Sequence, residues 1–164
     1  TQKISQIHSS LIAGYERDFG KYSDKISSQH ILAIFHNIPI QLSRNIDDSV
    51  KRFKFKDIIE KKTRYQDLAG PIHWLEKCKL LSKCQPINCQ PTSPLPALAK
   101  ENIFKLFMFD IGLLGNMLGL SYKEHREQSF NYKGYIAENF VQNELVAKYG
   151  SPTYSWEYAR SEIE

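Results

Sequence analysis

The chain has 164 residues, 41% of them hydrophobic, a size that suits one domain, or one domain and a fragment, with a substantial core. Its formal net charge is a modest +4, so the placement of the charges is more informative than their sum. Three cysteines, an odd number, and the lack of a signal-like apolar segment at the start argue against export and favour the reducing cytoplasm. The last residues stop without a turn or cap, so we expect a piece of a longer protein.

Two helices are predicted first. Apolar residues at helical spacing predict a helix over Ile4–Tyr22. Its apolar face consists of Ile4, Ile7, Leu11, Ile12, Tyr15 and Phe19. Ser27 or Ser28 is predicted to cap a second helix, which Pro39 kinks or restarts.

A basic and aromatic region follows. After a polar turn at Asn45–Ser49, the alternation of basic with aromatic residues in Lys51–Lys56 predicts a short half-buried strand. We then expect a brief helical turn, Asp57–Lys61, and a helix over Tyr65–Lys79, which Pro71 kinks. The outward-facing residues at this helix are expected to be Arg64, Tyr65, Gln66 and Lys77.

Two antiparallel strands are predicted at Leu80–Ile87 and Ile103–Phe109, joined by a Pro-rich loop too long for a tight hairpin. Asp110 is expected to cap a short helix that Gly119 ends. A membrane span is the alternative for this apolar run. We reject it because Lys105, Asp110 and three glycines interrupt a run barely long enough to cross a bilayer.

The last elements are a polar connector, Ser121–Ser129, a strong helix over Tyr132–Tyr149, and a strand that begins at Tyr154–Tyr158. Apolar residues surround most of the axis of this last helix, which predicts that it is buried. The overall order of helices and strands is that of a winged helix. We therefore predict a mainly α (α+β) fold with a small antiparallel sheet.

Five segments together resemble the C-terminal region of a prokaryotic family of AAA+-type ATPases, a region known only as a domain of unknown function. The segments are Tyr15–Phe19, Asn37–Ser43, Trp74–Leu81, Phe104–Leu114 and Lys133–Leu145. The resemblance implies a winged-helix-like domain at 1–128 and, at 129–164, the start of a domain similar to the restriction-endonuclease (PD-(D/E)XK) fold. The pair Gly70-Pro71 departs from the uninterrupted helix of that family.

The ATPase activity implied by the resemblance cannot lie in this segment, because the glycines form no phosphate-binding Gly-x-x-x-x-Gly-Lys-Ser/Thr loop. ATP and magnesium are expected only in a missing N-terminal domain, and this segment needs no cofactor. A zinc site is a second possibility, built from His73, Cys78, Cys84 and Cys89. Their spacing is not that of Cys-x-x-Cys zinc knuckles. We favour three reduced thiols instead, with Cys78 near the core and Cys89 exposed.

The main nucleic-acid signal is the basic stretch 51–64, which contains only Asp57 and Glu60 as acids. Its cations are Lys51, Arg52, Lys54, Lys56, Lys61, Lys62 and Arg64. In a winged helix they would lie just ahead of the recognition helix, where they could meet DNA phosphates. The alternative is a surface that docks on the missing ATPase domain.

Glu138 and Glu164 are candidates for a vestigial metal site. The resemblance matches Glu138 to the glutamate that nuclease-like folds carry on their first core helix. Too few hard-cation ligands follow for magnesium chemistry, so we expect no nuclease activity. The alternative, which we favour for Glu144, is an ion pair with Lys133, Arg126 or Arg160.

Together these observations predict a non-catalytic C-terminal fragment of an AAA+-type ATPase, acting as a DNA-binding or protein-docking module without membrane contact. A free-standing winged-helix regulator that binds duplex DNA is the alternative.

Overall fold

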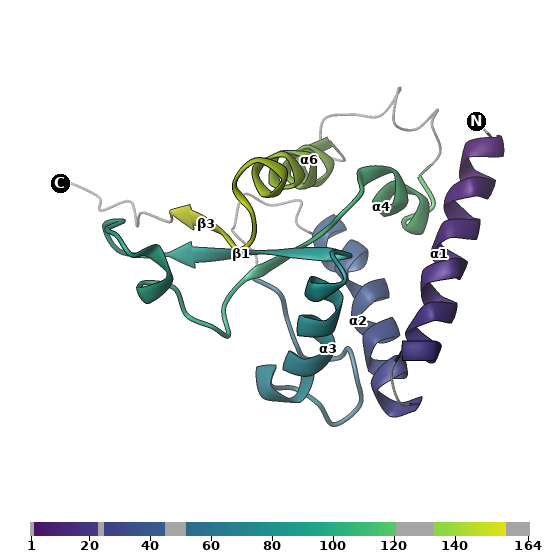
Figure 1. Cartoon of the computed structure of the whole chain (residues 1–164), viewed down its shortest axis with the longest axis horizontal. Coiled ribbons are helices and arrows are strands. Elements are labelled where there is room, and N and C mark those ends of the chain that lie inside the picture. Colours follow the sequence, from purple (N-terminus) through teal and green to yellow (C-terminus); the bar gives the residue numbers. More distant parts are fainter. Residues whose placement is uncertain (1, 23–24, 45–51, 121–132, 157–164) are drawn as a thin grey trace.

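The computed structural model describes residues 2–22, 25–44, 52–120 and 133–156 (Figure 1). Its helices are α1 (Gln2–Tyr22), α2 (Lys25–Ser43), α3 (Tyr65–Lys77), the short 3-10 turn η1 (Leu95–Ala97), α4 (Ile111–Met117) and α6 (Lys133–Tyr149). Its strands are β1 (Leu81–Ile87), β2 (Lys105–Met108) and β3 (Thr153–Trp156). The mainly α, α+β prediction is confirmed.

The three strands form one mixed sheet in the order β2-β1-β3. β1 and β2 pair antiparallel, with Leu81 opposite Met108, as the sequence predicted. β3 lies on the other side of β1 and runs parallel to it, with Cys84 opposite Thr153. In Figure 1, α6 lies above the sheet, α2 and α3 lie below it, and α1 stands at the side. The sheet is therefore the middle of three layers.

α1 and α2 match their predicted positions, although α2 begins slightly earlier and continues through Pro39 to Ser43. Phe19 packs edge-on against both Phe35 and Trp74, which joins α1, α2 and α3 in one core. The predicted apolar face of α1 is only half right. Its later residues are buried or half-buried, but Ile4, Ile7 and Leu11 are exposed.

The basic and aromatic segment is not the predicted strand. Phe53 is buried and Phe55 half-buried, so the alternation of sides is correct. One backbone hydrogen bond, from the Phe53 N–H to the Phe104 carbonyl (2.8 Å), ties the segment to the start of β2. The backbone of Lys54 instead bonds to a side chain, that of Gln41, so no ladder forms.

The prediction of a helical turn at Asp57–Lys61 is also wrong. Asp57 (φ 67°) and Lys61 (φ 64°) both adopt the left-handed conformation, which interrupts a right-handed helix. An isolated bridge between Ile59 and Lys62 closes the turn. A winged helix has a second helix here, and this chain has a compact turn.

α3 ends earlier than predicted, at Lys77, and contains Pro71 within its length. Tyr65 was expected to face outward, but its ring packs against Phe55 and Phe104. Its hydroxyl donates to the Glu101 carboxylate at 3.3 Å. Burial and then the nearby Glu101 charge raise the pKa of the Tyr65 hydroxyl. This tyrosine is therefore part of an aromatic cluster beneath the loop before β2.

The predicted ends of α4 are confirmed. The Asp110 side chain accepts a hydrogen bond from the Leu113 amide at 2.7 Å, as an N-cap residue should. At the other end, Gly119 adopts φ +69°, and the Leu120 amide donates back to the Gly115 carbonyl at 2.9 Å. This is the Schellman arrangement, for which glycine is best suited.

α6 is not a buried helix. It covers the sheet with Tyr135, Asn139 and Gln142, which are all buried. The residues left exposed are largely its apolar ones, namely Phe140, Val141, Leu145 and Tyr149. The prediction that α6 is buried on all sides is wrong. The side that packs on the sheet carries Asn139 and Gln142, which form hydrogen bonds to β2 and β1, so the apolar residues on the other side stay exposed.

The predicted boundary between domains at 128 and 129 lies outside the described residues, as do the predicted polar turn and the connector. On either side of it, the chain shares one sheet, since β3 pairs with β1 and α6 packs on β1 and β2. Among the helices in the described ranges, none has both the length and the apolar character that a membrane span requires.

Candidate nucleic-acid interface

A groove of about 500 Å³ lies between the second half of α2, the segment 52–57 and the start of β2. Its apolar floor includes Ile38, Leu42 and Phe53, which belong to the core. Polar and basic side chains line the remainder. The groove is thus part of the fold, built on a helix and a strand that the core holds in place.

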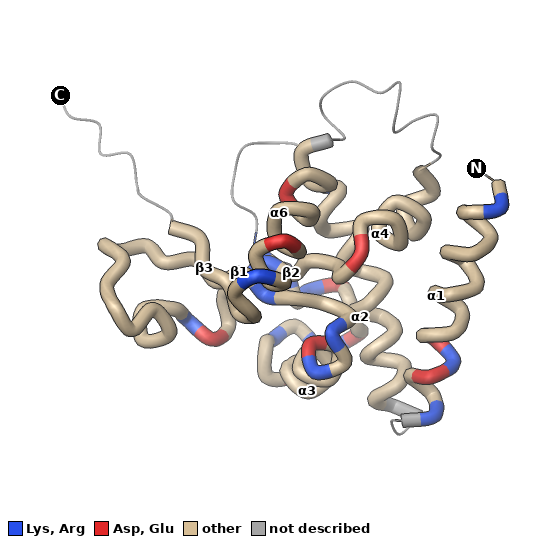
Figure 2. Tube along the Cα trace, turned by 45° about the horizontal axis from the view of Figure 1, so that its top comes forward, with Lys and Arg blue, Asp and Glu red and all other residues tan. Residues whose placement is uncertain are grey.

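The groove is strongly basic. Among the described residues, its lining cations are Arg44, Arg52, Lys54, Lys56 and Lys105, and its lining carboxylate is Asp57. Figure 2 shows basic residues gathered where the chain passes β1 and β2. Cations concentrated in a concave surface attract anions more strongly than the same charges spread over a convex one.

Gln41 fixes the segment that carries three of these cations. Its side-chain amide donates to the Lys54 carbonyl and accepts from the Lys54 amide, both at 2.8 Å. The Gln41 amide also donates to Asn37 one turn earlier, at 2.7 Å. Because the backbone of Lys54 is held on both sides, the side chains of Lys54 and Lys56 are presented at the groove without help from a β-ladder.

Lys105 is held at the groove by Glu138 on α6. The Lys105 Nζ lies 2.6 Å from Oε1 of Glu138, and its ammonium also lies 5.4 Å from the centre of the Phe107 ring. The lysine side chain is 13% exposed and the glutamate 46%. Lys105 was not among the partners predicted for the α6 carboxylates. For Glu144, the side chains of all three predicted partners lie outside the described part of the chain.

The predicted basic stretch divides into two parts. Arg52, Lys54 and Lys56 line the groove, whereas Lys61, Lys62 and Arg64 lie on the turn that leads into α3. Lys51 lies outside the described residues. The Lys62 Nζ is 3.5 Å from the His30 ring nitrogen, and Lys61 lies beside Glu60.

Two cations of the groove were not predicted from the sequence. Arg44 follows the end of α2, and Lys105 is the first residue of β2. Only the packing of α2 against β2 brings them to Arg52 and Lys54. Their separation in the chain gives no local signal for this convergence.

α3 does not present a basic face of the kind that reads DNA in winged helices. Its exposed residues include Gln66, Asp67, His73 and Lys77, a mixture of charges. The Asp67 carboxylate accepts from the Arg64 amide at the start of the helix. The exposed face of α3 is therefore of mixed charge, unlike that of the recognition helix predicted from the sequence.

The described residues contain no group of three or more histidine, cysteine or acidic side chains placed to share a metal ion. His73, Cys78, Cys84 and Cys89 are all described and do not meet. Cys89 is exposed as predicted, but Cys78 is exposed as well, against the expectation that it lies near the core. Partial desolvation raises the pKa of the Cys78 thiol. Glu164 lies outside the described residues.

A family model described as Domain of unknown function (DUF8612) matches residues 1–124. The match covers α1 to α4 and the antiparallel pair of strands, and it includes every residue that lines the groove. It stops before α6 and β3. No curated protein and no solved structure matches the chain.

Proposed function

The chain belongs to the DUF8612 family, a domain of unknown function, and from its basic groove we propose that it binds the phosphate backbone of duplex DNA as a non-catalytic module. The observation that carries this proposal is the convergence, among the described residues, of five cations on a groove of about 500 Å³ that is lined by one carboxylate, with Glu138 paired to Lys105 beside it. Phosphate contacts of this kind position a protein on DNA and supply most non-specific affinity.

The proposal is for binding with little sequence preference. Direct reading of bases needs several side chains directed into the major groove from a helix or ribbon. α3 would be that helix in a winged helix, and its exposed face is of mixed charge. The winged-helix relationship remains part of the proposal, supported by the order α2, α3, β1, β2 and by the contact of Phe53 with Phe104.

We also retain the proposed parent protein, an AAA+-type ATPase with this module near its C-terminus, which rests on the resemblance of the five segments. The reading frame around the gene segment tests this part directly. The proposal places the protein in the reducing cytoplasm, which is supported by three cysteines that are all free thiols.

Charge reversal in the groove is expected to weaken DNA binding strongly. In fluorescence anisotropy with a labelled duplex at low salt, Lys54→Glu together with Lys56→Glu should weaken binding about tenfold or more. The slope of log affinity against log salt should also become shallower by about one for each phosphate that is no longer neutralised. Both side chains are exposed, so the fold should be unchanged.

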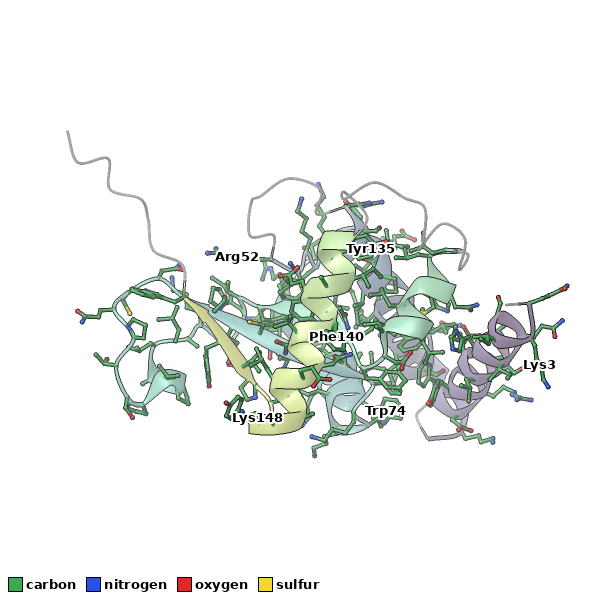
Figure 3. All side chains as sticks on the ribbon, turned by 90° about the horizontal axis from the view of Figure 1, so that it is seen from above. Lys3, Arg52, Trp74, Tyr135, Phe140 and Lys148 are labelled. Atoms are coloured by element: carbon green, nitrogen blue, oxygen red, sulfur yellow. The ribbon has the colours of Figure 1, made fainter. Side chains whose placement is uncertain are left out.

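The control is Lys3→Glu, a single charge reversal on the exposed start of α1 (Figure 3), which is matched to Lys54→Glu alone. It should leave both the affinity and the slope close to those of the unmodified chain. Binding that ignores salt, or an equal weakening by the groove and control variants, would remove the DNA proposal. The alternative would then be favoured, in which an acidic surface of the ATPase domain binds in the groove.

Glu138→Gln is expected to strengthen DNA binding severalfold at low salt. The substitution removes the carboxylate that neutralises Lys105 while keeping a polar side chain of the same size. Lys105 would then be available to a phosphate in the groove that it lines. Titration of the same duplex by anisotropy gives the measurement.

Asp18→Asn is the matched control, since Asp18 makes an exposed ion pair with Lys21 on α1 and its replacement changes the net charge equally. If Glu138→Gln weakened binding, or if both variants strengthened it to the same extent, Lys105 would not bind a phosphate. A metal-dependent decrease in binding caused by Glu138→Gln would instead revive the metal site predicted from the sequence.

A further inference from the structure

The orientation of α6 is fixed by hydrogen bonds from its polar side. The Asn139 carboxamide accepts from the Met108 amide (2.9 Å) and donates to the Met108 carbonyl (2.7 Å). Asn143 donates to the Phe109 carbonyl at 3.0 Å, and Gln142 bonds to Ser82 and Thr153. Rotation of the helix about its axis would break all of these bonds. The apolar side is therefore held outward.

That outward side is a continuous apolar face, here called the outer face of α6. It consists of Phe140, Val141, Leu145 and Tyr149, which are between 40% and 71% exposed, with Ala137, Glu144 and Lys148 beside them. A shallow concavity of about 480 Å³ lies over most of these residues. In Figure 3, which looks down on α6, Phe140 and Lys148 mark its length.

We infer that the outer face of α6 binds the same face of a second copy of the chain, with the two helices antiparallel. An isologous contact needs a surface that is complementary to itself. A two-fold axis at Leu145 would set Leu145 against its counterpart and Val141 against the partner copy's tyrosine at position 149. Val141, Leu145 and Tyr149 would cover one another in both halves of the contact, whereas Phe140, about 140° from Leu145 around the helix, would lie outside it.

The charges on the face support this arrangement. With the axis at Leu145, Glu144 of each copy and the lysine at position 148 of the other are offset by about 3 Å along the helices. Helices in contact lie about 8–10 Å apart, a distance that lysine and glutamate side chains span. Two identical ion pairs would then border the apolar centre. The aliphatic part of each lysine would also cover apolar surface.

The same charges argue against a lipid surface as the occupant. Glu144 lies between Phe140 and Val141 around the helix, one turn from Lys148, whereas helices that lie on anionic membranes carry cations on a separate polar side. A second copy pairs both Glu144 and Lys148, whereas an anionic membrane would repel Glu144.

The test is the dependence of mass on concentration by sedimentation equilibrium. The unmodified chain should dimerise, and Leu145→Glu should weaken dimerisation at least about tenfold by placing two carboxylates at the axis. Leu145 is 40% exposed, so circular dichroism should show an unchanged fold, and the thermal midpoint should match that of the unmodified chain at concentrations where both are monomeric. Ile7→Glu, a matched change on the exposed side of α1, should leave the dimer intact.

Charge exchange distinguishes a second copy from any other occupant. Glu144→Lys and Lys148→Glu should each weaken the dimer, and the two together should restore it, because only a self-complementary contact regains both ion pairs. A chain that remains monomeric at all concentrations would overturn the inference, as would binding of monomers to phosphatidylglycerol vesicles through this face. Failure of the double exchange to restore the dimer would also overturn it. None of these results depends on DNA.

Discussion

Asn139→Leu is expected to lower the free energy of unfolding by about 2–5 kcal/mol, since leucine fills the same space but leaves two buried backbone groups without partners. Asn139 is 0% exposed, and its carboxamide satisfies both the N–H and the C=O of Met108. These groups face away from β1, at the edge of the sheet, where another strand would otherwise bind them. Urea denaturation followed by tryptophan fluorescence gives the measurement.

Asn143→Leu is the matched control for this change. Asn143 lies one turn later on α6, is only partly buried, and makes one hydrogen bond, to the Phe109 carbonyl. Removal of this bond should cost about 1 kcal/mol. If Asn139→Leu cost no more than Asn143→Leu, the clamp on Met108 would not be what holds α6 on the sheet.

Phe104→Ala is expected to destabilise the chain by about 3–5 kcal/mol, the range for removal of a buried phenyl ring. Phe104 is 1% exposed, and its ring lies 5.7 Å from the rings of both Phe55 and Tyr65, centre to centre. It also stacks on Phe53, whose amide donates to the Phe104 carbonyl. Denaturation in urea should show the full destabilisation, and Phe104→Leu, which retains most of the buried area, should be clearly less destabilised.

The same substitution should also weaken DNA binding under conditions in which the variant remains folded. Phe53 and Phe55 anchor the segment that presents Lys54, so loosening their packing disturbs the groove. This separates Phe104→Ala from the charge reversals, which should change binding without changing stability. Unchanged affinity in folded Phe104→Ala would show that the clamp by Gln41 is sufficient to position the segment.

The elements that the sequence predicted well are those with local signals. The helix predicted at Tyr65–Lys79 is observed as α3, and Asp110 identifies the start of α4 because a carboxylate satisfies free amides there. β1 and β2 were predicted as an antiparallel pair joined by a long Pro-rich loop, and they pair in this way. In each case, residues close in the chain decide the structure.

The errors came from contacts between residues distant in the chain. The alternation in 51–56 predicts a strand, yet the Gln41 side chain occupies the backbone of Lys54 and prevents a ladder. The apolar residues around α6 gave no indication of which side is buried. That side is determined by Asn139, which bonds the backbone of Met108 at the edge of β2. Likewise, three of the five groove cations could be predicted because they are neighbours in the sequence, namely Arg52, Lys54 and Lys56. Arg44 and Lys105 reach the groove only through the packing of α2 against β2.

The place of β1 in the sheet has a consequence for how the protein is made. β1 lies at the centre, but its parallel partner β3 is the last described element of the chain. At about 5–20 residues per second, a ribosome needs several seconds between completing β1 and completing β3. During that interval the nascent chain carries a strand with a bare edge, the kind of surface that recruits chaperones or other nascent chains. Slow translation between residues 88 and 152 would prolong this exposure, so the rate of synthesis itself affects how much of the protein reaches its folded state.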